Sequence, residues 1–417
     1  MNHRCNAMKN GMFKCAGTLL MAALLSLVCC VESSDAAKEI KVGIVVGLTG
    51  GASSMGKHAW NSYQLIFDEL NGMGGIKSMG GAKVKYMVMD HQTKADIAGS
   101  NAEKLIRDGV SVIFGANFSD AAMVASQVCQ RSKIPFIDTT DGDVMITGRG
   151  FDYVFQTNPN INQLCDGALL FTQWLGKKTG KAPKKVAILN AQFATGYAGF
   201  KYFEETLPKV YDVVFKTTYP TAQQDFTGIV KNMKNLGVEY VFQFGMVADV
   251  IMITRAYKEM DFNPMGYMGV SGGHYNIDYI EGLRKDAEYT FCTSYFTSDL
   301  KVPKIKDLVA KYRNRFNLDF DATDATVANG ISVLVDALER AGTDNPTKLR
   351  DALKTTNLNV GQYWYVVPDG CKFDDKNRNV KQHTVTFQVR DGKQQAVYPE
   401  GYGSLAPVFP IPPWNKR

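Results

Sequence analysis

The stretch that decides the fold is IKVGIVVGLTGGASSMGKHAWNSYQLIFDELNGMGGI, residues 40–76. Residues 40–46 are mostly apolar and rich in valine and isoleucine, which is typical of a buried strand. A loop of small residues, 47–56, follows, and apolar residues then recur at helical spacing at Tyr63, Ile66, Phe67 and Leu70. Strand, loop and helix form the first half of a βαβ unit, whose loop lies at the carboxyl edge of a parallel sheet. Amide groups of such a loop favour a small anion, so we expect function near it.

The first 37 residues have the plan of a secretory signal. Basic residues precede an uncharged apolar run, Leu19–Val31, which is too short to span a membrane. Ser34, Asp35 and Ala36 then fit the small-residue rule for cleavage, so we expect residues 1–37 to be a signal peptide and the protein to be periplasmic. Lipoprotein anchoring at Cys29 or Cys30 is the alternative, but Val28 stands where a lipidation signal has a smaller residue.

Composition limits the classes of function. A chain of 417 residues predicts two domains, and its formal net charge of +6 is spread without a long run of like charges, so we expect no nucleic-acid partner. The cysteines after the leader are Cys129, Cys165, Cys292 and Cys371. None has the spacing of metal ligands, and their pairing stays open. We expect no metal, no cofactor and a monomeric protein.

Strand and helix patterns alternate strictly along most of the chain. Expected strands of a first series lie at 40–46, 83–90, 110–114, 134–138 and 151–156. After a turn-rich segment, 157–160, a second series begins with a helix and has expected strands at 185–190, 213–218, 240–244 and 267–269. Such alternation predicts parallel sheets covered by helices on both faces, and two series predict two similar lobes.

The remaining chain is expected to return to the first lobe and then to the second. Helical patterns beyond residue 300 include a core-facing stripe at Val327, Ile331, Leu334 and Leu338, and β patterns follow residue 358. The expected division is residues 1–37 signal peptide; 38–157 plus 297–358 first lobe; 158–287 plus 359–400 second lobe; 288–296 hinge crossover; 401–417 C-terminal coil. The fold class is therefore α/β, with two doubly wound parallel-sheet lobes joined by a three-strand hinge that opens and closes a cleft.

The segment GASSMGK, residues 51–57, has the spacing of a phosphate-binding P-loop. His58 follows where a serine or threonine would hold Mg²⁺, and we find no apolar strand ending in a Walker-B-like aspartate with a catalytic partner. These departures argue against an NTPase. A loop of small residues at a helix N-terminus can still receive a carboxylate.

Several segments together resemble one family. They are GLTGGASSMG, DELNGMGGI, KVKYMVMD, VSVIFGANFSDAA, KIPFIDTTDGD and the ending VFPIPPW. In order and spacing they are similar to the Leu/Ile/Val-binding type of periplasmic solute-binding protein, which serves ABC importers of branched-chain amino acids. The resemblance covers essentially the whole mature chain and implies the type I periplasmic-binding-protein fold.

The resemblance implies a ligand clamped between two lobes, with its carboxylate held mostly by the first. By position, Ser119 matches the carboxylate-binding hydroxyl, and Thr140 with the backbone of Asp141 and Gly142 matches the second anchor. Ser53, Ser54 and Met55 form the rim. Two plainer interpretations stay open, because Ser119 could be a helix N-cap and Thr140–Asp141 a loop with an Asx turn.

The second lobe departs from the pattern of amino-acid binders. Tyr197 follows the glycine that the family precedes with an aromatic residue, and Ser271 stands where the family has an acid for the ligand ammonium. Either Asp141 supplies that counter-charge or the ligand is not a zwitterion. The expected second wall is apolar and aromatic, from Phe193, Tyr197, Met246, His274 and Tyr275, although Phe193 and Met246 could be core. The disulfide of typical members is missing, since its positions match His91 and Phe118, so packing must supply the rigidity.

The candidate ligand-binding residues are Ser54, Met55, Ser119, Thr140, Asp141, Gly142, Phe193, Tyr197, Met246 and Ser271. We expect a non-enzymatic receptor that captures a small carboxylate-bearing ligand and presents it to the membrane permease of an ABC importer. That ligand would be a hydrophobic or branched-chain amino acid, or a related organic or aromatic acid. A ligand-sensing module for a regulatory partner is the alternative. A hydrolase has no support, because Ser119, Ser271 and His274 have no nucleophile-elbow context.

Overall fold

The computed structural model describes residues 39–417 except Gln382, Ser404 and the side chain of Ser271. Glu39–Arg417 form one compact unit, while the expected signal peptide, with Cys29 and Cys30, lies outside the described residues. Within the described part of the chain, none of the helices combines the length and apolar character needed to cross a membrane.

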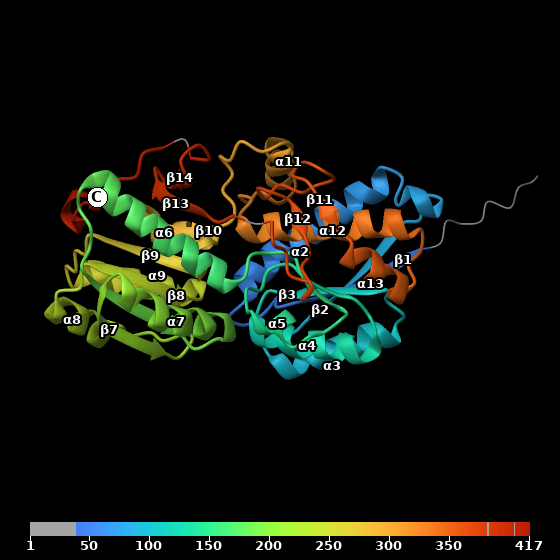
Figure 1. Cartoon of the computed structure of the whole chain (residues 1–417), viewed down its shortest axis with the longest axis horizontal. Helices are drawn as coiled ribbons and strands as arrows, with labels where there is room; N and C mark the ends of the chain where they lie inside the picture. Colours follow the sequence, from blue (N-terminus) through green and yellow to red (C-terminus); the bar gives the residue numbers. More distant parts are fainter. Residues whose placement is uncertain (1–38, 382, 404) are drawn as a thin grey trace, which may run out of the picture. The chain divides into compact units, whose positions relative to one another are not determined.

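The opening stretch forms the strand and helix that its pattern predicts. Strand β1 (Ile40–Val46) lies inside a parallel five-stranded sheet of order β2-β1-β3-β4-β5, and helix α2 (Ser53–Gly72) follows it (Figure 1). The other strands are β2 (Val84–Asp90), β3 (Val112–Ala116), β4 (Phe136–Asp138) and β5 (Val154–Gln156). Their connections include helices α3 (Ala95–Arg107), α4 (Ser119–Ser132) and the short α5 (Met145–Gly148). These elements make the first lobe.

The second series of elements builds a second sheet of seven strands, of order β14-β13-β10-β9-β8-β6-β7. Its parallel strands are β6 (Lys185–Ala191), β7 (Asp212–Tyr219), β8 (Tyr240–Gly245), β9 (Gly266–Gly272) and β10 (Phe291–Ser294). Strands β13 (Val385–Arg390) and β14 (Lys393–Tyr398) extend it in antiparallel pairing. The helices of this lobe are α6 (Ile161–Thr179), α7 (Ala194–Thr206), α8 (Thr227–Leu236), α9 (Val247–Glu259) and α10 (Ile277–Leu283). The predicted α/β fold with two similar lobes is confirmed.

The chain then returns to the first lobe, as its pattern predicts. Helices α11 (Ile305–Phe316) and α12 (Ala322–Ala341) both contact α2, and α13 (Pro346–Lys354) packs on α12 (Figure 1). The predicted stripe of α12 is wholly buried at Val327, Ile331, Leu334 and Leu338. The N-terminus of α12 also places polar residues beside α2, where Asp324 lies 2.9 Å from His58.

Two segments bear on where the lobes divide. Strand β10, inside the expected crossover 288–296, pairs with β9 and β13 of the second sheet. The chain from 359 to 380, which includes β12 (Cys371–Lys372) paired with β11 (Asn357–Leu358), bonds instead to the first lobe, for example from Val366 N to Asn329 in α12 at 2.9 Å. Gln156 N of β5 likewise donates to Asn377 O at 3.0 Å. We therefore propose that the first lobe extends to about residue 380 and that 288–296 belongs to the second.

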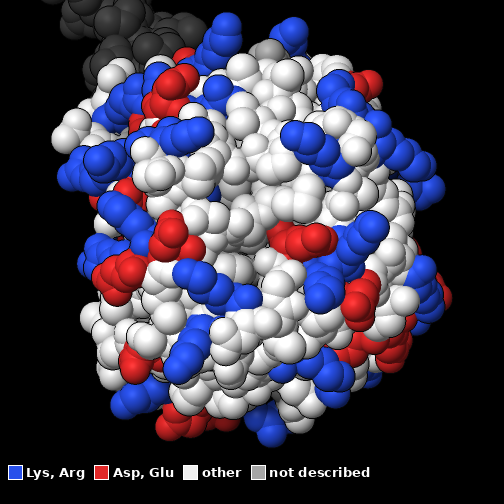
Figure 2. All heavy atoms as spheres, turned by 90° about the vertical axis from the view of Figure 1, so that its left-hand side faces the viewer, with Lys and Arg blue, Asp and Glu red and all other residues white. Residues whose placement is uncertain are grey.

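The surface and the cysteines add little chemistry. On the face shown in Figure 2, basic and acidic side chains are interspersed, so that face has no stripe of one charge. Cys129, Cys165, Cys292 and Cys371 are all buried and free. The core of this protein is therefore held without disulfides among these four residues.

Candidate functional site

The site lies where strands of the first sheet end. Loops after β3 and β4 and the first turn of α2 bring together Asn117, Phe118, Ser119, Thr140, Asp141, Gly142 and Met55. Opposite them, the second lobe supplies Phe193, Thr195, Met246, Gly272 and Tyr275. The cavity enclosed by these residues, the cleft cavity, holds about 30 Å³ of space. That space holds a water molecule but not an amino acid or an aromatic acid, so the two lobes are closed on each other. A ligand of that size would displace the side chains that face each other here.

Direct contacts hold the lobes together across the cleft cavity. The hydroxyl groups of Ser119 and Thr195 form a hydrogen bond, and the carbonyl of Gly142 accepts from Ile161 N at 2.8 Å. A side chain at Gly142 would begin 3.3 Å from Thr195 Cγ2, so the glycine lets the second lobe approach this loop. Ser119, Gly142 and Thr195 therefore take part in lobe closure and also form part of the cavity wall.

The candidate residues divide into those that line the cleft cavity and those that do not. The structure brings together Met55, Ser119, Thr140, Asp141, Gly142, Phe193 and Met246. Ser54 lies outside the lining and bonds to the second lobe elsewhere, Tyr197 is 53 % exposed, and the side chain of Ser271 is outside the described part. His274, expected in the second wall, is wholly buried and lies against Tyr279 with ring centroids 5.0 Å apart.

The register of helix α7 explains why Thr195, and not the expected Tyr197, lines the cleft cavity. Helix α7 begins at Ala194, so both residues lie in its first turn. Two residues along a helix are about 200° apart around its axis, so when Thr195 faces the cleft Tyr197 faces solvent. Sequence reasoning also missed Asn117, Phe118 and Gly272. The resemblance gave none of these three a role in ligand binding, and Phe118 entered only as a position of the missing disulfide, although Asn117 and Phe118 directly precede Ser119.

Asp141 uses the hydrogen-bond donors of the first lobe. Its carboxylate accepts from Ala116 N at 3.0 Å and from Ser119 Oγ at 3.4 Å, and the N–H of Asn117 also faces it. Ser119 is the first helical residue of α4, after the N-cap Phe118, so its hydroxyl serves Asp141 and Thr195 rather than capping the helix. The N-cap interpretation of Ser119 is therefore wrong.

A second carboxylate, Asp138, lies directly behind Asp141. It accepts from Asp141 N at 2.9 Å and from Thr140 N at 3.3 Å, so an Asx turn formed by Asp138 shapes this loop. Burial raises the pKa of both carboxyl groups, and the charge of Asp141 raises that of Asp138 further. In contrast, Thr140 Oγ1 is buried beside the cleft cavity without a hydrogen-bond partner.

Hydrogen bonds and ring packing hold the loops that carry the site. Asn117 has a left-handed backbone (φ 58°), and its side chain accepts from Gly47 N at 2.8 Å and donates to Ala52 O at 3.1 Å. The His91 and Phe118 rings stack with centroids 6.4 Å apart, and His91 Nε2 donates to Ala116 O at 2.8 Å. Packing therefore joins the two positions that the resemblance assigns to a disulfide.

The small-residue loop after β1 uses its own amide groups internally. Gly47 N donates to Asn117, Leu48 N to Asp90 at 2.8 Å and Ala52 N to Thr93 Oγ1 at 3.0 Å. These amides are not available for an anion, so the first expectation from the sequence, an anion held by this loop, does not apply to them. The loop instead supplies Met55 as one edge of the cleft cavity.

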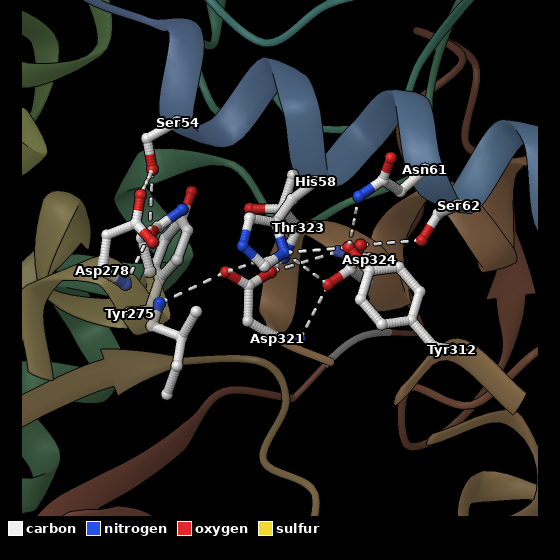
Figure 3. A network of polar contacts seen from close by, with 12 residues as sticks. Ser54, His58, Asn61, Ser62, Tyr275, Asp278, Tyr312, Asp321, Thr323 and Asp324 are labelled. Carbon is white, nitrogen blue, oxygen red and sulfur yellow. Dashed lines mark hydrogen bonds and ion pairs between the residues drawn. The ribbon is translucent and has the colours of Figure 1, made fainter. Parts of the chain in front are cut away.

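A second polar contact between the lobes starts at Ser54 (Figure 3). Its hydroxyl lies 3.1 Å from Asn276 Oδ1 and also hydrogen-bonds to Asp278, both at the start of α10. One turn along α2, His58 Nδ1 lies 2.9 Å from Asp324 Oδ2, and Asp321 accepts from Ile277 N of the second lobe at 3.4 Å. We call His58, Asp321 and Asp324 the His58 cluster.

The His58 cluster is a buried cation between two carboxylates. Burial by itself lowers the pKa of His58, but the charges of Asp321, Asp324 and Asp278 and the hydrogen bond to Asp324 raise it to about 10. Asp321 also caps α12 by accepting from Thr323 N at 2.8 Å, and Ser62 Oγ donates to Asp324 at 2.7 Å. Ligand atoms of the three lie within 4.8 Å of one another, but a protonated imidazole and amide-bonded carboxylates oppose a metal ion.

The contact at Ser54 leads to a first prediction. Ser54→Ala removes the bonds to α10 but leaves the cleft cavity intact, so the closed form becomes less favourable. We expect ligand affinity to fall about 5- to 10-fold, as for the loss of one hydrogen bond to a charged group. Isothermal calorimetry measures it, with Ser53→Ala as the matched control in the same helical turn. An unchanged affinity would show that this contact does not contribute to closure.

Comparison with known proteins decides the family. The sequence profile described as "Periplasmic binding protein" matches residues 39–394. The chain belongs to this family. Periplasmic binding proteins are solute-binding receptors of the periplasm, and the Leu/Ile/Val-binding type and type I fold of this member are confirmed by its relatives.

Named relatives agree with that assignment. The Leu/Ile/Val-binding protein homolog 8 of Brucella abortus is 26 % identical, over 92 % of this chain and 95 % of the relative. The branched-chain amino acid substrate-binding protein LivJ of Streptococcus pneumoniae, in complex with isoleucine, has a TM-score of 0.76 at 21 % identity and covers 87 % of this chain and 100 % of its own. A solute-binding protein of Rhodopseudomonas palustris in complex with 3,4-dihydroxybenzoic acid has a TM-score of 0.74 at 23 % identity, with 85 % and 95 % covered.

Proposed function

We propose that this periplasmic binding protein is the exported receptor of an ABC importer and delivers a small ligand from the cleft cavity to a membrane permease. The observation that carries the proposal is a cavity whose walls come from both lobes and are joined by the Ser119–Thr195 contact. Residues 1–37 would direct export. A permease that recognises the closed form would then read the bound state of the receptor.

The ligand is captured when the two lobes close on it. The ligand first contacts the first-lobe loops that carry Ser119, Thr140 and Asp141, and contacts with Phe193 and Met246 then favour the closed form. Selectivity lies in this second step, because a ligand shifts the equilibrium only by its differential affinity for the closed form. Catalysis is not part of the proposal, since the lining described here pairs no serine with a histidine.

A double variant tests the binding site. Ser119→Ala with Thr140→Ala removes two polar groups from the cavity wall, so we expect affinity to fall about 10- to 100-fold from hydrogen bonds of roughly 1 kcal/mol each. The melting temperature without ligand should change little. Calorimetry measures the affinity, and Ser132→Ala at the exposed end of α4 is the control. Equal affinity in the double variant and the wild type would reject the site.

The transport role needs its own test. Uptake of a radiolabelled ligand by proteoliposomes that contain the permease and ATPase encoded beside this gene should depend on the receptor. ATP hydrolysis should rise when the loaded receptor is added. A partner that proves to be a kinase or chemoreceptor, with no stimulation of a permease, would replace transport by sensing.

A further inference from the structure

The first lobe already holds a carboxylate of its own. The position that the resemblance assigns to a ligand carboxylate is defined by the Ser119 hydroxyl. In the structure, that hydroxyl and the amides of Ala116 and Asn117 face the carboxylate of Asp141. Asp141 is 4 % exposed and lines the cleft cavity, so it is part of the site and not of the surface. The donors around Ser119 that would receive a ligand carboxylate are therefore engaged, whereas the Thr140 hydroxyl is free to donate or to accept.

The charge of the surroundings also opposes an anion. The lining contains one carboxylate, Asp141, and none of its described members is a lysine, arginine or histidine. Burial raises the pKa of Asp141 to about 7, and the charge of Asp143 adds to this rise, while the charge of Asp141 raises the pKa of Asp138 behind it. An anionic ligand would meet the charge of Asp141 with no cation in the lining, or would force Asp141 to take up a proton, and either costs free energy in a site that excludes water.

Unused acceptors remain in the cavity wall. A carboxylate has about four lone-pair positions, and the donors named above occupy three of those of Asp141 at most. Thr140 lines the cavity and is 7 % exposed. Its Oγ1 atom is buried and has no hydrogen-bond partner. These oxygen atoms can accept hydrogen bonds from a ligand. The rest of the wall, with Phe118, Phe193 and Met246, is apolar or aromatic.

We propose that the ligand presents an N–H donor group, an amide or an ammonium, to Asp141 and Thr140, and carries an apolar body against the walls of the second lobe. This inference rests on the proposed receptor function and specifies its class of ligand. It replaces the carboxylate-bearing ligand that the resemblance implies. It also sets this chain apart from the structural neighbour with 3,4-dihydroxybenzoic acid, a ligand that has no N–H group.

A panel of matched compounds tests the inference on the wild-type protein. Benzoate, benzamide and benzylamine share one skeleton, and 3-methylbutanoate, 3-methylbutanamide and 3-methylbutylamine share another. The amide or the amine of a skeleton should raise the melting temperature and give a heat of binding, while its carboxylate should not. Comparison of the amide with the amine of each skeleton distinguishes a neutral ligand from a cationic one. Leucine and leucinamide show whether a carboxylate beside an ammonium adds to binding or opposes it.

An isosteric variant then tests Asp141 itself. Asp141→Asn keeps the shape and can keep the bond from Ala116 N, but it removes the charge and replaces the oxygen that accepts from Ser119 by a donor. We expect the affinity for the bound amide or amine to fall about tenfold and the affinity for the matched carboxylate to rise. Asp96→Asn is the control, because Asp96 is exposed in the first turn of α3, also in the first lobe, and does not line the cavity. It should leave both affinities within about twofold.

The outcomes separate this inference from the proposed function. Binding of amides or amines that weakens in Asp141→Asn supports both. Binding of carboxylates alone, still dependent on Ser119 and unchanged in Asp141→Asn, overturns the inference and keeps the receptor function. If none of the compounds binds, both the inferred ligand class and the receptor function are rejected for the compounds of this panel. If Asp141→Asn does not fold, the wild-type panel still decides the class of ligand.

Discussion

His58→Gln is expected to lower the free energy of unfolding by about 3–5 kcal/mol at pH 7, because it removes the only cation of the His58 cluster and leaves two buried carboxylates. His58 is 3 % exposed, and Asp324 Oδ2 lies 2.9 Å from its Nδ1. Asp321 and Asp324 are at most 2 % exposed, so neither gains a strong interaction with water in compensation. Urea denaturation followed by circular dichroism measures the loss.

The pH dependence gives the same test a second readout. The pKa of His58 is raised from 6.5 to about 10 in the folded protein. A raised pKa contributes stability that is fully present below pH 6.5 and is lost as the pH rises towards 10. The wild-type free energy of unfolding should therefore contain a component that declines across this window. In His58→Gln the decline should come at lower pH, from Asp321, whose pKa burial raises to about 7 even beside the His58 cation.

His383→Gln is the matched control for that variant. His383 also pairs with an aspartate, Asp369, but its side chain is 73 % exposed. Exposed ion pairs contribute little, so we expect a change of less than about 1 kcal/mol. If His58→Gln were as mild as His383→Gln, the cluster would not hold a buried imidazolium.

Thr195→Trp is expected to weaken ligand binding about 100-fold, because an indole cannot fit where the lobes meet and overpacking costs up to about 3 kcal/mol. Thr195 is 3 % exposed and contacts Ser119 across the cleft. First-lobe contacts with the ligand would remain, while closure would be prevented. Calorimetry with the amide or amine that the wild type binds measures the affinity, and small-angle X-ray scattering should show a larger radius of gyration.

Glu205→Trp provides the control for that substitution. Glu205 is exposed on the same helix, α7, away from the cleft cavity. Affinity and radius of gyration should both match the wild type. A Thr195→Trp protein that binds normally would show that the closed contact between Ser119 and Thr195 is not the bound form.

Local patterns predicted most of the fold. Strand β1 and helix α2 follow from the apolar run at 40–46 and the helical spacing after it, and the stripe at Val327 and Ile331 is buried as expected. These features depend on neighbours in sequence, because strand and helix periodicities are set by the backbone. Which residue of α7 faces the cleft depends on where this helix begins. The sequence pattern does not specify that position, so Tyr197 was predicted in place of Thr195.

The sequence by itself determined the family, the two-lobe α/β architecture and which strand-end loops carry Ser119, Thr140 and Asp141. Only the tertiary structure decided what those loops do with their hydrogen-bond donors. Asp141 follows Ala116 by 25 residues and Ser119 by 22 residues along the chain. Whether a donor is free or engaged therefore depends on distances of about 3 Å between two loops. The pairing of His58 with Asp321 and Asp324 likewise joins residues more than 250 positions apart, and no local pattern specifies it.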